Sequence, residues 1–129
     1  MVELGEKTQE TAVWAPDAVG DKRLLLLMLY GKAIECIDEA LERIEAGDMV
    51  GKGEKLIQAQ DIVLELTDSL DMRGGSLAQN LQGLYTYVYR RLVRGNIRLD
   101  TAAIAEARKI MDDLYRAWQQ AMVDLANAA

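Results

Sequence analysis

The fold is decided by the stretch DKRLLLLMLYGKAIECIDEALERIEAG, which occupies residues 21–47. Its large apolar residues recur in alternating steps of three and four, so they lie along one face of a helix. This face carries Leu27, Tyr30, Ile34, Ile37, Leu41 and Ile44. Asp21 is a favourable N-cap, and Gly47 is a favourable residue just beyond a helix C-terminus. The stretch therefore predicts an amphipathic helix from Asp21 to Ala46.

Three further segments repeat this spacing. The second helix follows a glycine-rich turn at residues 47–53 and ends near Gly74-Gly75. The third begins at Ser76 and is closed by Gly95-Asn96, and the fourth opens at Asp100 and Thr101. Their apolar seams are Leu56, Ala59, Val63, Leu66 and Leu70; Leu77, Leu81, Leu84 or Tyr85, Val88 and Leu92; and Ile104, Ala107, Met111, Leu114, Trp118, Met122 and Leu125. Because short connections place successive helices side by side and antiparallel, the sequence predicts an all-α, antiparallel four-helix up-and-down bundle.

The domain organisation follows from length and composition. The 129 residues suit a single domain, and we expect it to span residues 21–129. Residues 1–20 are acidic and have no apolar periodicity, which predicts a mobile N-terminal segment without a secretory signal. The apolar run at residues 24–29 is too short to cross a membrane. We therefore expect a cytoplasmic protein that does not insert into membranes.

Composition also excludes several functions. A net charge of -6 argues against nucleic acid as a partner, because such binding relies on basic residues that displace counterions from phosphates. The chain has no histidine, which removes histidine-ligated metals and histidine-based catalysis, so we expect no metal and no cofactor. Its single cysteine, Cys36, falls in a helical pattern and is expected to be a buried small apolar residue.

The arginines are unevenly distributed. Residues 72–99 carry five arginines and no acidic residue, whereas residues 21–71 carry twelve acidic residues against six basic ones. The five are Arg73, Arg90, Arg91, Arg94 and Arg98. One interpretation is that the third helix pairs with acidic neighbours, each exposed pair contributing under about 1 kcal/mol. The alternative is a surface that docks an acidic partner.

Several helices carry more apolar surface than one seam requires. The first helix has a second stripe at Leu26, Leu29, Ala33, Cys36 and Ala40, and further apolar residues lie off the seams of the second and fourth helices. This surplus either widens the core or leaves a groove open to an amphipathic helix. Tyr85 and Tyr87 are two apart, so one should enter the core while the other faces a ligand. The candidate groove residues are Leu26, Leu29, Ala33, Ile57, Leu64, Tyr87 and Ile110.

The order of several motifs resembles the flagellin-specific export chaperone family (FliS). The motifs are Leu27-Met28-Leu29-Tyr30, Ala46-Gly47-Asp48, Leu56-Ile57-x-Ala59-Gln60-x-Ile62, Gly74-Gly75-x-x-Ala78-x-Asn80-Leu81-x-x-Leu84-Tyr85-x-Tyr87-x-x-Arg90-Arg91-Leu92-x-x-x-Asn96-x-x-x-Asp100, and Ala117-Trp118. The resemblance implies a chaperone that holds the disordered C-terminal segment of flagellin, prevents premature polymerisation and presents it to the flagellar type III export apparatus. A ligand that orders on binding keeps a modest affinity per unit area, which permits release.

The N-terminal segment departs from the family pattern. Members usually carry a tyrosine in this segment and a Ser-Pro before the first helix, whereas this chain has no tyrosine before Tyr30 and has Asp21-Lys22 at the cap. We hypothesise that Val13 and Trp14 form a lid that occupies the groove until cargo displaces it. The sequence leaves a homodimer possible.

One enzyme remains as an alternative. Small all-helical chorismate mutases bind a dicarboxylate with buried cations, and this chain has Lys55, Arg90 and Arg91 on helices. Such an enzyme needs these cations around a central cavity, whereas the seams are apolar throughout.

Overall fold

The computed structural model describes residues 22–128 and confirms a bundle of four helices, with no strand in that range. The helices are α2 (Lys22–Glu45), α3 (Met49–Asp68), α4 (Ser76–Arg98) and α5 (Thr101–Ala128), with a 3-10 helix η1 (Met72–Gly74) between α3 and α4. The expected mobile segment at residues 1–20 lies outside the described residues. No helix between residues 22 and 128 combines the length and the apolar character that a membrane span requires.

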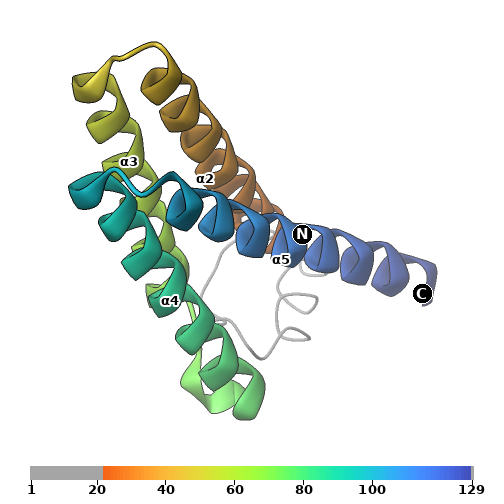
Figure 1. Ribbon diagram of the computed structural model, residues 1–129. Helices are drawn as coiled ribbons and strands as arrows, with labels where there is room; N and C mark the ends of the chain where they lie inside the picture. The colour runs from red at the N-terminus through yellow and green to blue at the C-terminus, as the bar shows by residue number, and fades with distance from the viewer. Residues whose placement is uncertain (1–21, 129) are drawn as a thin grey trace.

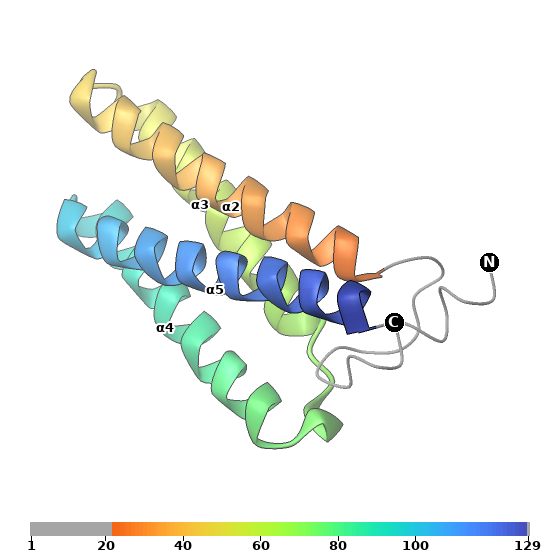
Figure 2. The same ribbon diagram turned by 90° about the vertical axis from the view of Figure 1, so that its right-hand side faces the viewer.

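The four helices form a closed ring in which each packs against two others: α2 against α3, α3 against α4, α4 against α5, and α5 against α2. The α2–α3 and α4–α5 connections lie at the same end of the bundle (Figures 1 and 2). From that end α4 and α5 diverge, and the C-terminal part of α5 extends beyond the other helices (Figure 1). The bundle is therefore tightly closed at one end and splayed at the other.

The connection between α2 and α3 is shorter than the glycines suggested. Gly47 has a φ of 74°, as expected for a residue that ends a helix. Asp48 is the N-cap of α3, and its side chain accepts a hydrogen bond from the Gly51 amide at 2.9 Å. The turn predicted somewhere within residues 47–53 is thus confirmed, and it occupies residues 46–48, because the aspartate cap starts the helix before the last two glycines.

The end of α4 also differs from the prediction. Gly95 and Asn96 do not close the helix; it continues to Arg98, and Leu99 takes the left-handed conformation with a φ of 52°. Gly95 is buried within the helix because α5 approaches closely here: a Cβ atom at this position would overlap the side chain of Ile104. This glycine therefore permits helix contact rather than a turn.

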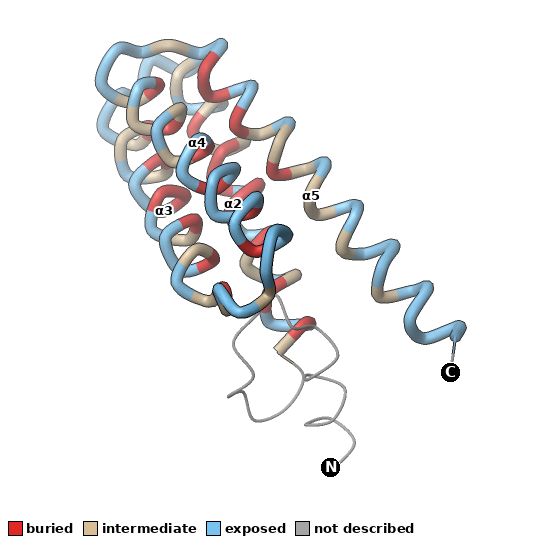
Figure 3. The backbone as a smooth tube through the Cα atoms, turned by 90° about the horizontal axis from the view of Figure 1, so that it is seen from below, coloured by how far each residue is buried: buried red, intermediate tan, exposed pale blue. Residues whose placement is uncertain are grey.

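The core runs along the inner faces of the helices, as the red segments of Figure 3 show. Tyr30 and Tyr85 are its largest fully buried side chains. Cys36 is buried, as predicted, and burial raises the pKa of its thiol. On α5 the last buried residue is Met111. The seam predicted to continue to Leu125 is therefore enclosed only in its first half.

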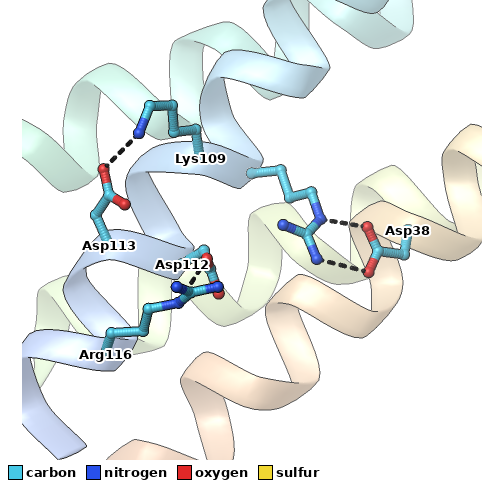
Figure 4. A network of polar contacts seen from close by, with 6 residues as sticks. Asp38, Lys109, Asp112, Asp113 and Arg116 are labelled. Atoms are coloured by element: carbon cyan, nitrogen blue, oxygen red, sulfur yellow. Dashed lines mark hydrogen bonds and ion pairs between the residues drawn. The ribbon is translucent and has the colours of Figure 1, made fainter.

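Each neighbouring pair of helices is also joined by a polar contact. The contacts are Glu39–Lys55 for α2 and α3, Lys52–Asn96 for α3 and α4, Arg91–Glu106 for α4 and α5, and Asp38–Arg108 for α2 and α5. Figure 4 shows the last of these beside two ion pairs within α5, Lys109–Asp113 and Arg116–Asp112. Directional contacts of this kind fix the register of the helices, while apolar burial supplies most of the stability.

Candidate partner-binding surface

Two of the predicted groove residues lie in the core. Leu26 and Ala33 are buried, so the expectation that they are surplus to the bundle is wrong. The reason is that α2 has two neighbours, α3 and α5, and must bury a wide arc rather than one seam. The second stripe of α2 faces α3, as shown by the Cys36 thiol, which lies 3.5 Å from the side-chain oxygen of Gln58.

Three other predicted residues lie on α2 and α3. Leu29 is half-buried and packs against the core. Ile57 and Leu64 are exposed, and their spacing of seven residues places them on one face of α3. Gly53, one turn before Ile57, lies next to Asn96 of α4. The exposed face of Ile57 and Leu64 is therefore on the side of α3 nearer to α4.

The remaining two predicted residues lie between α4 and α5. The Tyr87 hydroxyl is exposed and donates a hydrogen bond of 2.9 Å to Glu106, and this bond raises the pKa of Tyr87. Ile110 follows Glu106 by one turn on α5 and is half-buried against the core. Tyr85 is buried and Tyr87 exposed, as predicted. The seven predicted residues thus do not form one continuous groove.

The divergence of α4 and α5 leaves two leucines of the predicted α4 seam exposed (Figure 1). Leu77 and Leu84 are two turns apart on α4 and are 50% and 39% exposed. They lie on the side of α4 that meets α5. Arg91 follows Leu84 by seven residues, so it points to the same side, and it pairs with Glu106 of α5. On α5, Ile110 and Leu114 are half-buried and pack against the core. We call Leu77, Leu84, Ile110 and Leu114 the α4–α5 apolar face.

A cluster of aromatic side chains lies deep between α2, α4 and α5. The hydroxyls of Tyr30 and Tyr85 are hydrogen-bonded, and the Trp118 indole N–H donates to the Tyr30 hydroxyl at 3.1 Å. The ring of Tyr115 stacks on that of Tyr30, with centroids 6.4 Å apart. Burial raises the pKa of Tyr30 to about 12 and also raises that of Tyr85. Both phenols therefore stay neutral at physiological pH, and the cluster anchors the splayed part of α5.

Lys55 and Arg91, two of the three cations considered for a dicarboxylate site, take part in ion pairs between helices. Arg91 contacts Glu106 at 2.7 Å, while Lys55 contacts Glu39 at 3.5 Å on the far side of the bundle. A dicarboxylate-binding enzyme would need its cations to converge on a common cavity. Arg91 and Lys55 do not converge in this way. Within residues 22–128, His, Cys, Asp and Glu side chains form no group of three able to hold a metal ion.

Known proteins resemble this chain over most of its length. The family model described as "Flagellar protein FliS" matches residues 15–125. The flagellar secretion chaperone FliS of Bacillus subtilis is 42% identical over 98 residues, which are 76% of this chain and 73% of that protein. The FliS chaperone of Salmonella typhimurium is 39% identical over 98 residues, covering 74% of this chain and 73% of that protein. The FliS chaperone of Escherichia coli is 32% identical over 101 residues, which are 77% of this chain and 74% of that protein.

Proposed function

Because this chain belongs to the FliS family of flagellar secretion chaperones, we propose that it binds the disordered C-terminal segment of flagellin in the cytoplasm, prevents its premature polymerisation and assists its type III export. The observation that carries this proposal is the α4–α5 apolar face, in which Leu77 and Leu84 of α4 are exposed and Ile110 and Leu114 of α5 are half-buried. FliS proteins are chaperones, so the alternative of a chorismate-mutase type enzyme is set aside.

The apolar face suits an amphipathic helix as ligand. Such a helix can lie between α4 and α5 and cover Leu77, Leu84 and Leu114 with its own apolar stripe. Completing the burial of each half-exposed leucine contributes about 1 kcal/mol, since full burial of such a side chain contributes roughly 1.5–3 kcal/mol. Covering the apolar stripe of flagellin would at the same time remove the surface through which its subunits assemble. Ile57 and Leu64 offer a second contact point for a long extended cargo.

Titration of the full chain with a peptide of the flagellin C-terminal segment tests the proposal. We expect a stoichiometric complex with a negative heat capacity change, because apolar surface is buried. Leu77→Glu should weaken binding at least tenfold. The matched control is Gln79→Glu, which places the same carboxylate two residues away on a different side of the same helix turn. Equal affinities of the two variants would contradict the assignment of this face.

We further propose that residues 1–20 form a regulatory segment, in which Val13 and Trp14 act as a lid over the apolar face of the chaperone domain at residues 21–129. The support is sequence-based: these are large apolar residues in an otherwise acidic segment. Deletion of residues 1–18 should then tighten flagellin binding, and an unchanged or lower affinity would refute the lid. A homodimer that covers the same face is the competing occupant, which light scattering of the free protein tests.

A further inference from the structure

Helix α4 carries a charge opposite to that of the whole protein. The chain has a net charge of -6, yet α4 contains Arg90, Arg91, Arg94 and Arg98 and no acidic residue. Two of the four are neutralised by neighbours: Arg91 lies 2.7 Å from Glu106, and Arg94 lies 2.8 Å from Asp100. Pairing within the bundle, the simpler of the two interpretations from sequence, thus accounts for half of this charge.

The other two arginines make no ion pair within residues 22–128, and both are exposed. Arg98 lies in the last turn of α4, where a cation also complements the partial negative charge of the helix end. Arg90 lies two turns earlier and has no such role. An exposed cation without an ion-pair partner contributes little to stability. The stability of the fold therefore does not explain why position 90 is an arginine.

An apolar side chain lies among these arginines. Ile97 is 77% exposed, the highest value among the large apolar residues described. Arg90, Arg94, Ile97 and Arg98 are spaced by four, three and one residues and therefore lie along one stripe of the helix. We call these four residues the α4 basic face. Tyr87 borders it, with the Arg91 guanidinium 6.0 Å from the centre of its ring.

We propose that the α4 basic face docks an acidic protein segment in which an apolar residue lies between carboxylates. Guanidinium groups pair with carboxylates through two parallel hydrogen bonds in one plane. Ile97 lies between the arginines, so an apolar side chain of the ligand can pack against it. A nucleic acid fits less well, because the rest of this acidic protein repels a phosphate backbone. The same repulsion directs a short acidic segment to α4, the part of the described chain that lacks acidic residues.

This surface is separate from the proposed cargo site. Arg90 points to a different side of α4 from Leu84, because the two are six residues apart. Arg98 points to the same side as Leu84 but lies fourteen residues further on, about 21 Å along the helix. The acidic segment and an amphipathic cargo helix can therefore bind at the same time. The α4 basic face thus goes beyond the proposed flagellin binding and supplies a second partner site on a loaded chaperone.

Fluorescence anisotropy with a labelled peptide of repeating Glu-Glu-Leu units tests the proposal on the full chain. The variant R90E/R98E should raise the dissociation constant at least tenfold. The matched control is K109E/R116E, which reverses two exposed cations of α5. Each substitution changes the net charge by -2, so both double variants go from -6 to -10. We expect the control to change the dissociation constant less than threefold, and the peptide to shift amide resonances of residues 87–98.

Several outcomes would overturn the α4 assignment. Equal weakening in both double variants would show a response to overall charge alone, and a wild-type dissociation constant above the millimolar range would show no site. Tighter binding of a thymidine oligonucleotide, lost in R90E/R98E, would assign the face to nucleic acid. Retained affinity of R90E/R98E for the flagellin peptide shows that the variant is folded and that the two sites are independent. If the flagellin peptide binds no variant but the acidic peptide behaves as expected, only the proposed cargo fails.

Discussion

Alanine substitutions at two glycines of α4 should have opposite effects on stability. Gly83 is exposed, and a Cβ atom there would meet no atom within 4 Å. Gly83→Ala should therefore stabilise the protein by about 0.5–1 kcal/mol, the gain for replacing glycine in a helix interior. Gly95 lies in the same helix and offers the same gain in helix propensity, so any difference between the two variants reports tertiary packing.

The packing cost at Gly95 can be worked from its neighbours. An added Cβ atom would overlap the Cγ1 atom of Ile104, lie 2.9 Å from its Cδ1 atom, and lie 3.3 Å from the Asp100 carbonyl oxygen. Ile104 is fully buried, so its side chain has no free space to enter. Overpacking of this kind costs about 1–3 kcal/mol. After the propensity gain of about 0.5–1 kcal/mol is subtracted, Gly95→Ala should destabilise the protein by about 1 kcal/mol and by no more than about 2.5 kcal/mol.

Urea denaturation followed by circular dichroism measures both free energies of unfolding. The slope of the free energy against urea should stay constant, because neither change alters the surface exposed on unfolding. Combining Gly95→Ala with Ile104→Ala should show coupling of more than 1 kcal/mol, since the second change removes the overlapping atoms. The reasoning would be refuted if Gly95→Ala stabilised the protein as much as Gly83→Ala, or if the two changes were additive.

Three further substitutions test local features. Leu99→Gly should stabilise the protein by up to about 1 kcal/mol in thermal denaturation, because glycine adopts a positive φ without strain. Tyr30→Phe should cost about 1–3 kcal/mol in urea because it removes the hydrogen-bond partner of the buried Tyr85 hydroxyl, and changing both tyrosines to phenylalanine should recover part of this loss. Arg94 holds the pKa of Asp100 below its usual value, so this carboxylate stabilises the fold above the ordinary pKa of aspartate, and the contribution disappears as the pH falls through the lowered value. The Asp100 side chain also accepts a hydrogen bond from the Ala103 amide at 3.1 Å, as an N-cap of α5 does. Asp100→Asn should keep this bond and make the free energy of unfolding fall less steeply on acidification.

The periodicity of the sequence was sufficient to predict the four helices, since apolar residues at steps of three and four have one arrangement that buries them together. Helix ends were less predictable where a glycine had two possible roles. Gly47 has a positive φ and ends α2, whereas Gly95 lies inside α4 and admits Ile104. The local sequence contains no information on how closely another helix approaches, so these two roles could not be separated.

The candidate surface was less predictable than the fold. Leu26 and Ala33 appeared surplus because one seam per helix was assumed, while α2 in fact packs against two helices. Leu77 and Leu114 were assigned to the core, and Leu84 was one of two choices for it, because the helices were assumed to stay in contact along their full lengths. The angle between α4 and α5 depends on contacts between residues far apart in sequence, so no local pattern reports it.

The exposed leucines of α4 take no part in the directional contacts that hold the bundle together. At the connected end, Lys52 bonds to Asn96, Arg94 bonds to Asp100, and Gly95 lets α5 approach closely. These contacts depend on direction and distance, so they fix α4 against its neighbours. Towards the splayed end the open contacts of Leu77 and Leu84 are apolar, and apolar burial requires no particular direction. A partner helix can therefore replace water on these leucines without breaking any directional contact. Within the described chain, binding at the splayed end thus requires the smallest loss of interactions that stabilise the fold.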